Sequence, residues 1–242
     1  MKTLKETIFE ALRIKTGSKI RVHKTPIKIT SRKHLIEVIL SEVEENGYTC
    51  DLNHLDVSGI ADFSHLFVEG STYDLRDFNG NISEWDVSNA TNLNYMFYES
   101  KYTGENGDVS NWDVSKCKNF DSMFRESDYD GDLSKWDVSS GKNFTCMFYN
   151  SIFTGRKGSL KKWNMKNAVD LGAMFMSSNF TEDLSDWDVS NVVGMSQMFM
   201  DTQYTHNLEN WNVKKVKYAN QIFDRCPVEK NLPKWAYKFY YA

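Results

Sequence analysis

Residues 132–148 read DLSKWDVSSGKNFTCMF, and the pattern of this stretch recurs along most of the chain. Trp136 is followed twelve residues later by Phe148, and six of the seven tryptophans have a phenylalanine at that distance. The first members of the copies are Leu55, Trp85, Trp112, Trp136, Trp163, Trp187, Trp211 and the truncated Trp235. Self-similarity at a fixed period is typical of a repeat protein, so the chain is predicted to be an array of short units.

Successive tryptophans are 27, 24, 27, 24, 24 and 24 residues apart, and each change of length falls between a phenylalanine and the next tryptophan. We therefore expect that segment to be an external loop. Apolar residues occupy fixed positions, three before the tryptophan and two, eight and eleven after it. One unit cannot bury a tryptophan, a phenylalanine and a methionine by itself, so stacked units are expected to share one continuous core.

The triplet Trp-Asp-Val, as at residues 136–138, is expected to alternate buried, exposed, buried, as in a short strand. The serine that follows is placed to cap a short 3₁₀ or α-helical turn. The sequence thus predicts an α/β repeat fold in which short parallel strands form a narrow sheet along one side of a solenoid.

Two of the repeats carry a resemblance to a known family. WDVSNVVGMSQMF at residues 187–199 and WDVSNATNLNYMF at residues 85–97 resemble the WDVSNVTNMxxMF repeat of BspA-like leucine-rich-repeat proteins. The similarity extends over about residues 51–235. It implies a right-handed leucine-rich-repeat solenoid that is used for adhesion or protein binding.

The first fifty residues are predicted to be a separate α+β unit that caps the solenoid of residues 51–242. Residues 3–14 have helical apolar spacing, and residues 19–30 alternate as two short strands around a proline. Ser31 is placed to cap a second helix that runs to about Glu45.

This N-terminal unit is basic although the whole chain has a net charge of -4. A basic patch here is a candidate surface for phosphate or acidic groups, which makes nucleic-acid binding an alternative function. The patch consists of Lys19, Arg21, Lys24, Lys28, Arg32 and Lys33. Since no RNP, KH or helix-turn-helix pattern accompanies it, a solvated cap surface is the simpler interpretation.

The residue after each tryptophan is mostly aspartate, and it is expected to point outward. Each carboxylate either accepts a backbone N–H in the following turn or forms part of a binding face. Residues just before the tryptophan share that face and have mixed charges, which favours a protein partner over an ion. The candidate binding face consists of Asp86, Asp113, Asp137, Asp188, Lys135, Lys162 and Asp186.

Signals for catalysis or for a metal are lacking in the sequence. It contains no HExxH, GxSxG or phosphate-binding glycine loop, and its five histidines share no metal-ligand spacing. Residues 128–132, DYDGD, have glycine fourth rather than sixth and no glutamate, unlike an EF-hand loop. The four cysteines form no CxxC and are expected to be reduced thiols. We therefore expect no enzyme, no cofactor and no metal.

The N-terminal segment, MKTLKETIFEALRIK, lacks the apolar region of a signal peptide, and no stretch has the roughly 20 apolar residues of a membrane span. A cytoplasmic location is therefore expected, with the cell surface or a virion, reached by a non-classical route, as the alternative. The sequence favours a non-enzymatic bacterial or phage module that binds another protein. The alternatives are a surface or virion structural or adhesion protein, and a nucleic-acid binder.

Overall fold

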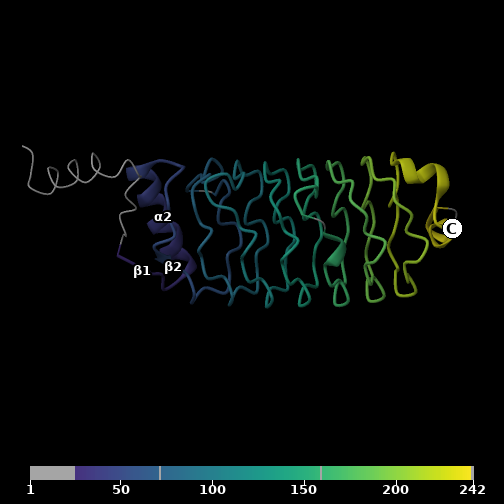
Figure 1. Cartoon of the computed structure of the whole chain (residues 1–242), viewed down its shortest axis with the longest axis horizontal. Helices are drawn as coiled ribbons and strands as arrows, with labels where there is room; N and C mark the ends of the chain where they lie inside the picture. The colour runs from purple at the N-terminus through teal and green to yellow at the C-terminus, as the bar shows by residue number, and fades with distance from the viewer. Residues whose placement is uncertain (1–24, 71, 159, 241–242) are drawn as a thin grey trace, which may run out of the picture.

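A computed structural model describes residues 25–70, 72–158 and 160–240. Each repeat forms one irregular coil of the chain, and the coils lie one after another along the long axis of the molecule, in chain order (Figure 1). The helix α2 (Arg32–Asn46) covers the end where the coils begin, and the helix α3 (Tyr237–Tyr240) lies at the opposite end. The remaining elements are short: β1 (Ile27–Lys28), β2 (Leu55–Asp56), η1 (Leu160–Lys162), η2 (Pro227–Asn231) and η3 (Lys234–Ala236).

Helix α2 has the boundaries that its capping residues predict. The side chain of Ser31 accepts the N–H of His34 at 3.1 Å, which satisfies one of the free donors at the helix start. Gly47 ends the helix with φ 79°, and its N–H donates to the carbonyl of Val43. The buried face of α2 consists of Leu35, Ile39 and Val43. The predicted helix at residues 3–14 lies outside the described residues, as does the predicted strand before Pro26.

The predicted α/β leucine-rich-repeat solenoid with a parallel sheet is wrong. In the described part of the chain, the only paired strands are β1 and β2, which join Ile27 to Leu55 and Lys28 to Asp56. The later Trp-Asp-Val segments do alternate in burial, but they form no strand. Their backbone groups are used in local turns: the N–H of Trp136 binds the carbonyl of Leu133 at 3.2 Å. A sheet needs these groups to reach the neighbouring coil.

Neighbouring coils are joined instead in the segment that starts seven residues after the tryptophan. Single parallel bridges link this position from coil to coil, for example Asn119 to Asn143. From there every second N–H donates to the next coil: Ser122 to the carbonyl of Thr145 at 2.8 Å, and Phe124 to that of Met147 at 2.9 Å. We call this set of bonds the ladder.

The helical turn predicted after the serine is also absent from the described coils. Residues ten and fourteen after the tryptophan have positive φ, as Ser122 at 54° and Glu126 at 55° do in one coil. A residue with positive φ cannot continue a right-handed helix. The segment therefore forms consecutive turns, in which the N–H of Met123 binds the carbonyl of Phe120 at 3.2 Å and that of Arg125 binds Ser122 at 3.2 Å.

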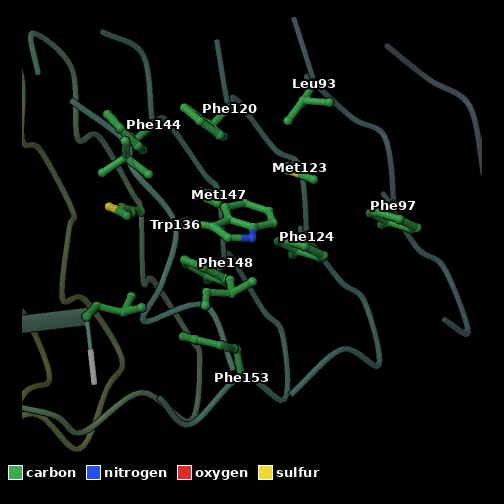
Figure 2. Packing of buried hydrophobic residues seen from close by; sticks show 14 of the residues in the cluster. Leu93, Phe97, Phe120, Met123, Phe124, Trp136, Phe144, Met147, Phe148 and Phe153 are labelled. Atoms are coloured by element: carbon green, nitrogen blue, oxygen red, sulfur yellow. The ribbon is translucent and has the colours of Figure 1, made fainter. Parts of the chain in front are cut away.

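The core consists of aromatic columns that continue from coil to coil, as predicted from the fixed apolar positions. Figure 2 shows Phe97, Phe124 and Phe148 in successive coils, with Trp136 beside Phe124 and Phe148. The rings of Phe97 and Phe124 are stacked with centroids 5.4 Å apart. Each indole N–H also donates to a carbonyl of the preceding coil, as Trp136 does to Val109 at 3.0 Å. The ladder N–H groups donate forward and the indoles donate backward, so adjacent coils are bonded in both directions.

A column of buried hydroxyl groups supports each turn, and sequence inspection missed it. Ser100, Ser127, Ser151, Ser178 and Thr202 are all buried, fifteen residues after a tryptophan. The Ser151 hydroxyl donates to the carbonyl of Phe148 at 2.9 Å and accepts the N–H of Phe153 at 3.4 Å. These bonds satisfy backbone groups that the aromatic columns shield from water.

Candidate binding surface

The aspartates after the tryptophans are bonded within their own coils. Oδ1 of Asp86, Asp113, Asp137 and Asp188 accepts the N–H of the serine two residues later at 2.9–3.0 Å. Bonds to the side chain and backbone of Ser115 hold the pKa of Asp113 below its usual value, and Ser190 has the same effect on the pKa of Asp188. These contacts are the ones expected if each carboxylate accepts a backbone N–H in the following turn, which was one of the two interpretations of this column.

The other members of the candidate binding face lie on the same exposed side of the coils. Lys135 donates to Oδ1 of Asn111 at 3.0 Å, in the preceding coil. Asp186 forms an ion pair of 3.2 Å with Lys161, and Lys162 is exposed at the end of η1. The seven residues thus occupy two positions of the repeat, directly before and directly after a tryptophan, and the structure gives the four aspartates after the tryptophans a structural role.

The structure describes three of the six residues of the predicted basic patch, Lys28, Arg32 and Lys33. Lys19, Arg21 and Lys24 lie outside the described residues. Lys28 is exposed on β1, and Lys33 forms an exposed ion pair of 3.7 Å with Glu37. Arg32 points to the first coil, where its Nε donates to the carbonyl of Ser64 at 2.7 Å. Arg32 therefore joins α2 to the coils.

A row of aromatic and cationic side chains crosses four successive coils on the ladder side. The guanidinium of Arg125 lies between two rings, 5.3 Å from the centroid of Tyr98 and 4.7 Å from that of Tyr149. Tyr98 contacts Tyr95 edge to face at 5.5 Å, and Tyr95 stacks on His65 at 4.7 Å. We call these five residues, His65, Tyr95, Tyr98, Arg125 and Tyr149, the aromatic row.

The aromatic row is partly accessible and carries fixed charges. Its three tyrosines and Arg125 are half-buried, and His65 is exposed. Nε of Arg125 donates to Glu126 at 3.1 Å. A hydrogen bond with Glu99, together with burial, raises the pKa of Tyr98 to about 12, so its hydroxyl stays protonated at neutral pH. The cation–π contacts of Arg125 with Tyr98 and Tyr149 favour this arrangement of the three side chains.

Sequence inspection missed the row because its members occupy two columns whose residue types vary from repeat to repeat. They stand ten and thirteen residues after the first residue of a copy, where other repeats have alanine, glutamine, methionine or aspartate. The only available signal was the occurrence of tyrosine and arginine beside the buried Met-Phe pair of three consecutive repeats. Without the geometry of the turns, that signal does not show that these side chains meet on one surface.

Within the described residues, no group of three or more histidine, cysteine, aspartate or glutamate residues is arranged to hold a metal ion. Nor does any helix in the described ranges have the length and apolar character that crossing a membrane requires.

Comparison with known proteins gives one match. A family model described as "Mycoplasma protein of unknown function, DUF285" matches residues 39–156 and again residues 150–239. The comparisons with curated proteins and with solved structures found no match. The two matched ranges include nearly all of the coils, and they support a repeat protein.

Proposed function

We propose that this chain, which belongs to the family described as Mycoplasma protein of unknown function, DUF285, is a non-enzymatic module that binds another protein. The observation that carries the proposal is the aromatic row. Its central side chain, Arg125, is held between Tyr98 and Tyr149 while all three remain partly accessible.

The chemistry of the row supports protein binding. Tyrosine and arginine are enriched among the residues that dominate protein–protein binding energies. Side chains that are already ordered lose less conformational freedom on binding, so more of the contact energy appears as affinity. The contacts from His65 to Tyr149 hold these side chains in place before a partner arrives.

The row is a better candidate than the aspartates of the predicted binding face. The carboxylates of Asp86 and Asp113 already accept backbone N–H groups, and a partner would compete with those bonds. The row crosses four successive coils, so an extended segment or a flat protein surface fits it better than a small molecule does. The finer resemblance of residues 187–199 to BspA-like repeats favours the same use, protein binding or adhesion.

The test compares full-length proteins as bait in lysate of the cell that encodes the chain. The row variant carries Tyr98→Ala and Tyr149→Ala. The matched control carries Asp86→Asn and Asp113→Asn; Asn164 and Asn212 occupy the same column and accept the same turn bond, so the control should fold normally.

We expect the wild type and the control to enrich the same protein in stoichiometric amount after nuclease treatment, and the row variant to lose it. A partner retained by the row variant would refute the role of the row. Enrichment of nucleic acid in place of a protein would refute the proposed function and favour the basic N-terminal unit.

A further inference from the structure

Two coils carry an extra three-residue turn, and both turns have the sequence Gly-x-x-Gly. The first is GENG at residues 104–107 and the second is GRKG at residues 155–158. We call them the acidic turn and the basic turn. They account for the two 27-residue spacings, and one 24-residue coil without an insertion lies between them.

The two turns are built in the same way. In each, the second glycine N–H donates to the first glycine carbonyl, Gly107 to Gly104 at 3.2 Å and Gly158 to Gly155 at 3.3 Å. The first glycines have φ of 81° and 75°, in the region that favours glycine. A Cβ on Gly107 or Gly158 would lie within 2 Å of a side-chain oxygen, at 1.8 and 1.7 Å respectively.

A threonine at the start of each turn has the same two bonds. The N–H of Thr103 donates to Asn79 at 3.0 Å, and its Oγ1 accepts the N–H of Glu105 at 3.3 Å. The N–H of Thr154 donates to Asp130 at 2.7 Å, and its Oγ1 accepts the N–H of Arg156 at 3.2 Å. The threonine bonds are thus shared, and the acidic turn has one more, from the side chain of its tip residue Asn106 to the carbonyl of Asn79 at 2.6 Å.

The tips have opposite charges. Glu105 and Asn106 stand in the acidic turn where Arg156 and Lys157 stand in the basic turn, and all four side chains are exposed. Asp108, directly after the acidic turn, adds a second carboxylate, half-buried against Tyr129. Both turns project from the equivalent point of their coils, so they share one edge of the stack.

We propose that this edge binds a second copy of the chain, with the acidic turn of each copy against the basic turn of the other. In a two-fold contact residue i meets j and residue j meets i, so two patches of opposite charge on one edge complement themselves. A two-fold axis through the intervening short coil places both pairs in contact at once. The aromatic row lies on the ladder segment, which precedes these turns in each coil.

The charge contact defines how the dimer should respond to salt and to charge reversal. Exposed ion pairs are weak and screened, so the dimer should be weak and should dissociate as ionic strength rises. Placing like charges opposite each other should raise the dimer dissociation constant by roughly tenfold or more.

The structure provides variants that exchange one natural turn for the other. Glu105→Arg with Asn106→Lys gives the acidic turn the basic tip, and Arg156→Glu with Lys157→Asn gives the basic turn the acidic tip. Each pair of substitutions gives one turn the tip that the other turn carries naturally. Asn106→Lys also removes the bond to the carbonyl of Asn79, so circular dichroism checks that each variant is folded. Sedimentation equilibrium of the full-length chain measures the dimer.

We expect wild type to dimerise at low ionic strength, each single exchange to be monomeric, and the double exchange to dimerise again. A mixture of the two single exchanges should form a heterodimer. A wild type that stays monomeric at low ionic strength, or single exchanges that dimerise as well as wild type, would overturn the proposal. Neither result bears on the aromatic row, so this test is independent of the proposed function.

Discussion

Nε of Arg32 donates to the backbone carbonyl of Ser64 at 2.7 Å, at the point where the ladder begins. Ser64 stands nine residues after Leu55, and the equivalent carbonyls of later coils accept an N–H from the coil before, as Asp121 accepts that of Tyr95 at 2.9 Å. Among the described residues, no coil precedes the first one. Arg32 supplies the missing donor from α2.

Replacement of Arg32 by alanine should therefore destabilise the whole chain. A half-buried carbonyl loses a charged donor, which costs about 1–3 kcal/mol of unfolding free energy. Urea unfolding followed by circular dichroism measures the change. Lys33→Ala is the control: its ion pair with Glu37 is exposed, and removing it should cost about 0.5 kcal/mol or less. Equal losses for both variants would contradict the capping role of Arg32.

The buried hydroxyl column predicts a second stability effect. Ser151→Ala leaves the N–H of Phe153 and the carbonyl of Phe148 without the hydroxyl that binds them, at a cost of about 1–3 kcal/mol. Ser151→Thr should cost much less, because Thr202 occupies the same column and makes the same bonds to Phe199 and Tyr204. Urea midpoints of the two variants test this, and a threonine variant as unstable as the alanine variant would argue against the bonds.

Substitution by glycine should change the stability of the fold differently at two alanines of one coil. Ala173 has φ 49°, a conformation that costs an L-residue about 1–2 kcal/mol and costs glycine little. Ala173→Gly should therefore stabilise the fold slightly or leave it unchanged. Ala168 is fully buried without positive φ, so Ala168→Gly should destabilise by about 1 kcal/mol. Thermal unfolding of both variants distinguishes the effects; a larger loss at Ala173 than at Ala168 would show that backbone strain there is negligible.

The pair of Lys161 and Asp183 predicts a loss of stability in acid. Burial raises the pKa of Asp183, but bonds from Lys161 at 2.8 Å and from the N–H of Ser185 at 2.9 Å outweigh it and lower the pKa from 3.8 to about 2. A carboxylate with a lowered folded-state pKa stabilises the fold above its unfolded pKa. This contribution should be lost as the pH falls from about 4 to about 2.

Urea unfolding at a series of pH values checks this expectation. Asp183→Asn is the matched variant, since Asn207 occupies the same position in the next coil and accepts a backbone N–H there. The difference in unfolding free energy between wild type and variant should shrink towards the acid end of the range. A difference that is constant across that range would contradict the assigned pKa.

Much of the core was predictable from the sequence, because columns such as Trp136 and Phe148 repeat at a fixed spacing and large apolar side chains must be buried together. The strand and the helical turn were predicted wrongly. Residues 136–138 do alternate in burial, but the side chain of Asp137 accepts a hydrogen bond from the N–H of Ser139, and this segment forms a turn in place of a strand. Alternation alone does not distinguish these two backbones.

The positive φ angles could not be predicted from residue type. Tyr95, Ser122, Cys146 and Gln197 occupy equivalent positions with φ from 53° to 60°, and none is glycine or asparagine. Bonds from the neighbouring coils hold these residues in the strained conformation, so the conformation depends on the stacked structure. The aromatic row depends on the same turns, so it could not be predicted either. The sequence therefore predicted only the face on the aspartate side of the coils.

The two-directional bonding between coils has a consequence for how such a chain can change its length. The junction made by Trp136 with Val109 has the same bond as those made by Trp187 with Leu160 and Trp211 with Leu184. A duplication or deletion of one whole unit would recreate this junction on both sides, whereas a partial unit would not. Recombination between the copies can therefore lengthen or shorten the array in whole steps while leaving both ends intact.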